Sequence, residues 1–228
     1  MIYRESLHRT YLIKNVSDKT GTCFTIDIDK KQYLCTAKHL LEDFKGDYID
    51  IMRNKQWIKL PVSLVGYGSK NSDIIVLASK TQLSPNYLLT TEENIVGLGL
   101  DVYFLGFPFG YICSDGKTVN QGFPIPFVKK AIVSAVEVDN ACVSLLLDGH
   151  NNLGFSGGPV IYTDHSTKKT HVISIISAYR CEYQSVFDQQ NEMKMPFQAL
   201  ANSGIIVSYS IQHALDAIAN NPIGFKLQ

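Results

Sequence analysis

Apolar and β-branched residues occur along this chain in short runs separated by polar turns. Runs of about 4–8 such residues, bounded by Gly, Asn, Asp, Ser or Lys, are typical of β-strands. Six runs predict strands at residues 10–14, 22–27, 32–36, 49–52, 57–64 and 73–78, with Asp29-Lys30-Lys31 as a hairpin turn after the second. Six more predict strands at residues 101–105, 127–138, 142–147, 159–163, 171–179 and 204–209.

Helical periodicity is limited to two segments. Residues 38–43 are long enough for one or two helical turns. In residues 211–219 the apolar side chains fall on one face, and Ser210 precedes them as a predicted N-cap. Pro222 follows soon after and ends this helix.

The many short strands and the terminal helix point to an all-β fold built from two small β-barrels. Residues 79–98 lie between the two sets of strands, include Pro85 and show no clear period, so we interpret them as the connection between domains. We expect an N-terminal barrel in residues 1–85. We expect a C-terminal barrel, followed by the helix, in residues 86–228.

Composition narrows the class of protein further. Hydrophobic residues make up 45% of the 228 residues and the formal net charge is zero, which excludes a disordered chain. The balance of 21 basic against 21 acidic residues argues against a nucleic-acid partner. No apolar run approaches the roughly 20 residues that span a bilayer, and charges interrupt the N-terminal residues where a signal peptide needs an apolar stretch. We therefore expect no membrane partner.

The cysteines indicate a reducing compartment. There are five of them, an odd number, and no two are spaced as a CxxC pair, which favours neither a disulfide framework nor a zinc site. We expect free thiols and a cytoplasmic protein, with one Cys23–Cys35 bridge left open as an alternative. The five are Cys23, Cys35, Cys113, Cys142 and Cys181.

The strongest chemical signal is the sequence GFSGGP at residues 154–159, followed by an apolar run. Its glycines permit backbone angles that other residues resist, so a tight turn is predicted here. In such a turn the amides of Gly154 and Ser156 can point at one place and form an oxyanion hole beside the Ser156 hydroxyl. The alternative is an ordinary glycine-rich hairpin.

A histidine and an aspartate complete the candidate chemistry. His39 follows a predicted strand, where a rigid position suits a general base that removes a proton from a serine hydroxyl. Asp73 heads an apolar strand, and a carboxylate there is costly to bury without a partner such as an imidazole. Taken singly, His39 is equally a surface or core histidine, and Asp73 equally a turn residue.

Together these motifs resemble the chymotrypsin-like (trypsin-fold) serine peptidases. The sequence TAKH ending at His39 is similar to the family's TAxH motif, and GFSGGPV is similar to its GxSGGP nucleophile motif. SDIIVL around Asp73 is similar to the aspartate strand, with Ile75 in place of the usual small residue. Gly21-Thr22-Cys23-Phe24 also resembles the strand before the histidine. The resemblance extends from about Thr10 to Ala219.

The resemblance implies two six-stranded antiparallel β-barrels with the active site between them. It implies that Ser156 attacks a peptide carbonyl of a polypeptide substrate, that His39 acts as general base and then general acid, and that Asp73 orients His39. The amides of Gly154 and Ser156 would stabilise the tetrahedral intermediate. No metal ion or organic cofactor is implied.

The positions where this chain departs from the family pattern indicate which branch of the family it resembles. Secreted zymogens carry Asp just before the nucleophile, where this chain has Phe155, and no Ile-Val-Gly-Gly activation sequence occurs near the start. We therefore expect no activation by insertion of a new N-terminus. The chain looks more like the bacterial high-temperature-requirement proteases, although few residues follow Ala219 and we expect no PDZ domain.

The resemblance also implies which residues line the substrate-binding pocket. His150 stands six residues before Ser156, where the secreted branch has the floor of the primary pocket, and would favour acidic or amide side chains. The alternative is a loop histidine outside the pocket. Ser177, Ala178 and Tyr179 would line the pocket and pair with extended substrate, with Tyr179 narrowing it.

The sequence leaves two candidate functions from different classes of protein, an enzyme and a binding module. The first is an intracellular serine endopeptidase held in check by narrow specificity or by a regulatory protein partner, because unchecked proteolysis in a cytosol is hazardous. The second is a binding or regulatory module with a protease fold and little turnover. A complete triad of His39, Asp73 and Ser156 favours the first.

Overall fold

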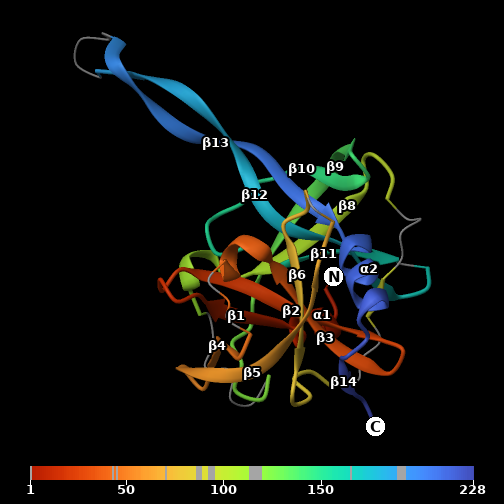
Figure 1. Cartoon of the computed structure of the whole chain (residues 1–228). Coiled ribbons are helices and arrows are strands. Elements are labelled where there is room, and N and C mark those ends of the chain that lie inside the picture. Colours follow the sequence, from red (N-terminus) through yellow and green to blue (C-terminus); the bar gives the residue numbers. More distant parts are fainter. Residues whose placement is uncertain are drawn as a thin grey trace.

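The computed structural model describes residues 2–42, 44, 46–69, 71–85, 89–91, 96–112, 120–164, 166–188 and 194–228. Its strands form two sheets, shown mainly in red to yellow and in green to blue in Figure 1, with the dark blue β14 added to the first sheet. The first sheet contains β1 (Thr10–Lys14), β2 (Thr20–Ile28), β3 (Lys31–Ala37), β4 (Tyr48–Arg53), β5 (Gln56–Tyr67), β6 (Ile74–Ser79) and β14 (Phe225–Lys226). The second contains β7 (Thr90–Thr91), β8 (Asp101–Gly106), β9 (Phe127–Asp139), β10 (Cys142–Asp148), β11 (Pro159–Asp164), β12 (Lys169–Phe187) and β13 (Lys194–Ser210).

Each sheet closes on itself. In the first, β3 pairs with β6 as well as with β2, so β1 to β6 form a barrel. In the second, β11 pairs with both β8 and β12, which closes β8 to β13. The barrel ladders are antiparallel, and the short β7 adds to β12 in parallel. The predicted all-β fold of two six-stranded barrels is therefore confirmed.

The helices are short and lie at strand ends or against the first barrel. They are α1 (Arg4–Leu7), the 3₁₀ turns η1 (Lys38–Leu41) and η2 (Pro108–Gly110), and α2 (Gln212–Asn220). The predicted N-cap is wrong by one residue, because Ile211 is the cap of α2 and Ser210 instead accepts the Gln212 amide at 3.2 Å. In the described residues, no helix is long and apolar enough to cross a membrane.

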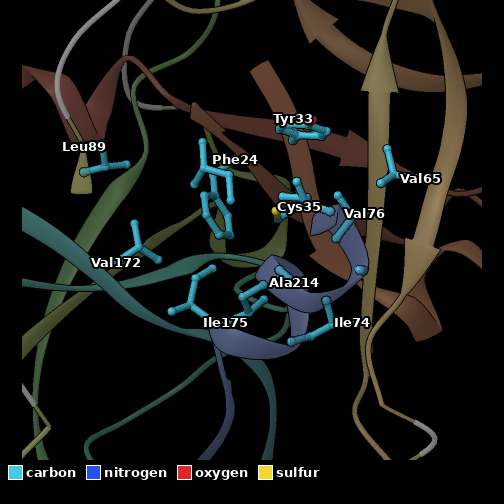
Figure 2. Close-up of a cluster of buried hydrophobic side chains, with 14 of the residues drawn as sticks. Phe24, Tyr33, Cys35, Val65, Ile74, Val76, Leu89, Val172, Ile175 and Ala214 are labelled. Atoms are coloured by element: carbon cyan, nitrogen blue, oxygen red, sulfur yellow. The ribbon is translucent and has the colours of Figure 1, made fainter. Parts of the chain in front are cut away.

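One hydrophobic cluster joins the two barrels. Figure 2 shows Phe24 and Val76 of the first barrel facing Ile175 of the second, with Ala214 of α2 beside them. Their strand neighbours Cys23, Ile75 and Ile176 belong to separate clusters within one barrel each, so strand alternation places Phe24, Val76 and Ile175 on the barrel faces that meet. Because α2 packs on the first barrel while following the last strand of the second, it ties the two barrels together.

The cysteines do not form a bridge in the described structure. Cys23, Cys35, Cys142 and Cys181 are free, and Cys113 lies outside the described residues. Cys23 stands opposite Thr36, and Phe24 opposite Cys35, so the two thiols belong to opposite faces of the ladder. Burial raises the pKa of both thiols, so they stay protonated and serve as small apolar core groups.

The predicted connection between domains is only partly described. Residues 86–88 and 92–95 lie outside the described residues, so the predicted boundary between residues 85 and 86 stays a prediction. The chain end returns to the first barrel, where Phe225 of β14 pairs with Gln32 of β3.

The largest difference from the predicted elements is an arm. We define the arm as residues 180–187 of β12 and 194–203 of β13. Strands predicted to end at residue 179 and to begin at residue 204 instead continue past the barrel as a two-stranded ribbon, which projects far from the body of the molecule in Figure 1. Its strands include residues 185–187 of β12 and Lys194 of β13.

Candidate active site

His39 is held at the junction of β3 and η1. The strand is buried to its last residue, Ala37, and the two residues after His39, Leu40 and Leu41, are buried as well. Between these anchors the imidazole points outward, and 41% of its side-chain surface is exposed. A base that must reach a substrate needs this combination of a fixed backbone and an accessible ring.

Asp73 holds His39 through both carboxylate oxygens. Its Oδ1 accepts the His39 backbone amide at 2.8 Å, and its Oδ2 lies 2.6 Å from His39 Nδ1. Because a carboxylate only accepts hydrogen bonds, Nδ1 carries the proton, and Nε2 of the neutral ring is left as the acceptor. Burial alone would raise the pKa of Asp73, but the hydrogen bonds from His39 and Ser177 and the charge of His39 outweigh it and lower that pKa.

Ser177 connects the two barrels at this point. Its hydroxyl donates to Asp73 Oδ2 at 2.6 Å, and its carbonyl accepts the Ser156 hydroxyl at 2.9 Å. His39, Asp73, Ser177 and Ser156 therefore form one continuous chain of hydrogen bonds across the interface. The sequence predicted Ser177 as a wall of the substrate site and missed its contact with Asp73, because no local pattern reports a contact between residues so far apart in the chain.

The hydroxyl of Ser156 donates its hydrogen bond to the Ser177 carbonyl rather than to His39. In the described part of the chain, no hydrogen bond joins His39 and Ser156. Catalytic hydrogen bonds are often long or misaligned in the absence of substrate, so the observed position is compatible with a nucleophile.

The glycine-rich loop around Ser156 is tied to the first barrel and to η2. Thr22 of β2 donates its hydroxyl to the Gly154 carbonyl at 2.7 Å and its amide to the Ser156 carbonyl at 2.8 Å. The Leu153 carbonyl accepts the Phe109 amide at 2.8 Å, which turns the Gly154 amide to the opposite side of that planar peptide.

Two amides beside Ser156 are left available. Over the described residues, neither the Gly154 amide nor the Ser156 amide donates to another protein group. Gly154 adopts φ +101°, a conformation that favours glycine. The geometry is compatible with the predicted oxyanion hole, which needs preorganised donors with no other partner.

Phe155 explains one departure from the family pattern. Its side chain is fully buried and meets Phe104 edge to face, with ring centroids 5.0 Å apart. An apolar anchor in the core of the second barrel thus orients this loop where the secreted branch places a carboxylate.

Gly157 is the position of this loop where a side chain fits least. It has φ +81°, and a Cβ would lie 2.1 Å from the Thr22 carbonyl and 2.2 Å from the Thr36 hydroxyl. We expect Gly157→Ala to lower the free energy of unfolding by about 3 kcal/mol, measured by urea denaturation. Gly97→Ala is the matched control, since a Cβ there meets nothing within 4 Å, and should change stability by less than about 0.5 kcal/mol. Equal stability of the two variants would contradict the packing argument.

The predicted pocket residues are only partly brought together. Tyr179 pairs with Ile206 and Ala178 with Val207, beside Ser177 on β12. His150 is exposed, and its Nε2 lies 3.4 Å from Asn152 Nδ2. In the described structure, His150 makes no hydrogen bond to Ser156 or to β12.

Two hollows flank η1. One of about 230 Å³ lies beside His39 and Asp73, and one of about 520 Å³ is lined by Leu40, Leu41 and Phe44 among others. Neither of these two is lined by Ser156 or Tyr179. Within the described residues, no three His, Cys, Asp or Glu side chains are close enough to hold a metal ion.

Solved structures share this fold. The chain is similar to Rv3671c of M. tuberculosis H37Rv in its inactive form, with a TM-score of 0.59 and 14% identity over 95% of this chain and 88% of that one. It is similar to the HtrA-type protease AlgW with a tripeptide, with a TM-score of 0.58 and 19% identity over 95% of this chain. It spans 60% of the AlgW chain. No family model and no curated protein matches the sequence.

Proposed function

We propose that this chain, whose fold is that of the trypsin-like serine proteases, is a serine endopeptidase acting through Ser156, His39 and Asp73. The observation that carries the proposal is the chain of hydrogen bonds from His39 through Asp73 and Ser177 to Ser156. It joins the two barrels and includes the three kinds of side chain that nucleophilic catalysis by a serine uses, a histidine, a carboxylate and a serine.

The first half-reaction follows from the positions of these groups. Ser156 Oγ forms a bond to the scissile carbonyl carbon while its proton passes to His39 Nε2. The amides of Gly154 and Ser156 stabilise the oxyanion, and the imidazolium is stabilised by the ionised Asp73. The tetrahedral intermediate then loses its C–N bond, and the proton on Nε2 goes to the leaving amine, which gives an acyl-enzyme.

The second half-reaction repeats these steps with water. A water molecule gives a proton to His39 Nε2 and bonds to the acyl carbon. The bond from that carbon to Ser156 Oγ then breaks, and Nε2 returns its proton to Oγ. The product carboxylic acid leaves and the enzyme is restored.

Substrate binding frees the nucleophile in this proposal. An extended polypeptide that pairs with β12 donates a backbone amide to the Ser177 carbonyl, which the Ser156 hydroxyl occupies in the structure. The displaced hydroxyl then turns to His39. Ser177 therefore both supports Asp73 and exchanges one partner for another when substrate arrives.

A fluorophosphonate probe tests the proposed function. Such a probe bonds only to an activated serine, so we expect labelling of the wild-type protein at Ser156, located by mass spectrometry of the labelled peptide. Failure to label in buffer and again with cell extract added would reject an active serine peptidase. Labelling that appears only with extract would support regulation by a protein partner, which we also propose.

One observation favours a second candidate function. Because the Ser156 hydroxyl donates to Ser177 in the structure, a protease-fold binding or regulatory module with little turnover is the alternative. It predicts binding of polypeptide without labelling by the probe. The two functions are therefore separated by the same experiment.

The role of His150 in specificity is a separate prediction. If this exposed histidine reaches the side chain before the scissile bond, the enzyme prefers Glu, Asp or Gln there. His150→Ala should then reduce that preference by about tenfold, measured as cleavage-site frequencies in a peptide library. His8→Ala is the control, since it lies next to α1 in the first barrel. Unchanged preference would assign His150 to the loop alone.

A further inference from the structure

The arm continues the strand that carries Ser177. From Ser177, whose carbonyl faces Ser156, β12 runs a further ten residues to Phe187. At about 3.3 Å per residue this is roughly 33 Å of strand leading away from the proposed active site. The arm is therefore not a separate feature but an extension of the substrate-binding strand.

One edge of β12 is open along this whole length. β11 pairs with β12 as far as Ile175, and Gly157 and Gly158 exchange backbone hydrogen bonds with Ile176. Past Ile176, β12 pairs only with β13 among the described residues. An unpaired strand edge is a template for another strand.

The backbone groups at this edge follow from one hydrogen bond and the register. The Arg180 carbonyl accepts the Ser203 hydroxyl at 2.9 Å, so Arg180 faces β13. Pairing is regular from Cys181 to Ser185, and successive residues of a strand point their amide and carbonyl to opposite sides. Cys181, Tyr183 and Ser185 thus present their backbone groups at the free edge.

The two edges of the arm differ in how well they accept a strand. β13 contains Pro196 within the arm, and a proline, which has no backbone N–H, blocks edge pairing. β12 has no proline from Lys169 to Phe187. The edge that leads to Ser156 is therefore the one left suited to pairing.

Exposed apolar side chains accompany the open edge. Tyr183 is 73% exposed and stands opposite Leu200, which is 62% exposed, so the two share one face. A two-stranded ribbon is marginally stable in water, and a third strand beside β12 would cover the Tyr183 side of this face. Exposed patches of this kind mark interaction sites.

The base of the arm also contacts the loop that leads to Ser156. Asn202 donates its side-chain amide to the Asn151 carbonyl at 2.7 Å, and the Gly149 amide donates to the Gly204 carbonyl at 2.9 Å. Binding along the arm is thus connected by direct contacts to the loop of the proposed nucleophile.

We propose that the free edge of β12 along the arm binds, as an added antiparallel strand, the segment of an unfolded polypeptide substrate that precedes the scissile bond. The inference rests on the proposed peptidase function and gives it a substrate class. Tyr183 lies six residues beyond Ser177, so it faces about the seventh residue before the scissile bond. An apolar side chain there would contact Tyr183 on the same face of the extended sheet.

A ladder of peptides tests this binding mode. One peptide that the wild-type protein cleaves in a proteome-derived library is resynthesised with 3, 6, 9 or 12 residues before the scissile bond and the same residues after it. We expect kcat/KM to rise about tenfold or more between 3 and 9 upstream residues, because added backbone hydrogen bonds accumulate along the edge. Extending the peptide after the scissile bond should give no such rise.

Two variants test whether the arm causes the rise in kcat/KM with the number of upstream residues. In the first, residues 182–201 are replaced by Asn-Gly, a two-residue turn that joins Cys181 and Asn202, which are paired in register. In the second, Tyr183→Pro removes an outward amide, with Tyr183→Ala as its matched control for the lost ring. With the first variant, we expect kcat/KM for the longer peptides to fall to the value for the shortest peptide. For the peptide with nine upstream residues, we expect Tyr183→Pro to lower kcat/KM several-fold more than Tyr183→Ala.

The outcomes separate the two hypotheses. Labelling of Ser156 by the fluorophosphonate needs no upstream residues, so its absence in wild type rejects the peptidase function itself. If labelling is intact, three results would overturn the role of the arm. They are a kcat/KM that does not rise with the number of upstream residues, no cleavage of any library peptide, or the same rise in wild type and in Tyr183→Pro. A changed oligomeric state in the shortened variant with an unchanged ladder would instead assign the arm to self-association.

Discussion

Replacing Ser156 by Ala is expected to lower the rate of peptide hydrolysis by about 10⁴-fold or more. The substitution removes the only atom that forms the acyl bond, and the amides of Gly154 and Ser156 that remain account for a small residual rate. The measurement is kcat/KM on a peptide that the wild-type protein cleaves. In cells, comparison of new N-termini in proteins from wild-type and Ser156→Ala strains identifies the physiological substrates.

The fold should survive this substitution. The Ser156 hydroxyl makes a single hydrogen bond, to the Ser177 carbonyl, so we expect a change in unfolding free energy within about 1 kcal/mol. Ser134→Ala is the matched control, because its exposed hydroxyl lies on β9 and contacts only the Ile132 carbonyl at 3.5 Å. Hydrolysis by Ser156→Ala at the wild-type rate would show that another residue or a contaminant carries the activity.

Asp73→Asn is expected to lower kcat by about 10⁴-fold at neutral pH, although the side chain keeps its size. The amide nitrogen of an asparagine facing His39 Nδ1 is a donor, so it favours the tautomer with its proton on Nε2. That tautomer cannot accept the Ser156 proton. The amide also faces the Ser177 hydroxyl, which now donates to Asp73 Oδ2 at 2.6 Å. Asp101→Asn, at the exposed start of β8, is the control and should keep the wild-type rate.

The same variant has a signature in acid stability. Because the pKa of Asp73 is lowered in the folded protein, its ionised form stabilises the fold above the ordinary aspartate pKa of about 4. That contribution is lost as the pH falls through the lower folded value. Asp73→Asn has no such group, so its stability should fall less steeply below pH 4 in urea titrations. An equally steep fall would place the acid sensitivity elsewhere.

Where core burial shapes a strand, the sequence predicted it well. The strand at Thr10–Lys14 was predicted with its observed bounds, and the turn at Asp29 and Lys30 has the positive φ angles of a tight hairpin. The residues of this strand are buried on both faces, so its continuous apolar run is visible locally. The three motifs were found because they occur together in the order and spacing of a known family, although His39 and Asp73 taken singly are ordinary residues.

The arm was missed because no core shapes it. Its residues are mostly exposed on both faces, so they carry no alternation, and their strands are held by backbone pairing and by contacts such as Tyr183 opposite Leu200. The short β14 was missed similarly, because its pairing with β3 depends on where the chain end returns. The packing of the Phe155 side chain into the core also could not be predicted from the residues next to it in the sequence.

By itself the sequence determined the strand pattern, the two sets of strands and the three motifs that carry His39, Asp73 and Ser156. Those properties depend on neighbours within a few residues, where side-chain period and backbone freedom act. Only the tertiary structure decided that Ser177 bonds to both Asp73 and Ser156, and that β12 leaves an open edge leading to them. These two contacts of Ser177 join residues that are 104 and 21 positions apart, and they exist because barrel closure and packing of α2 bring distant backbones together.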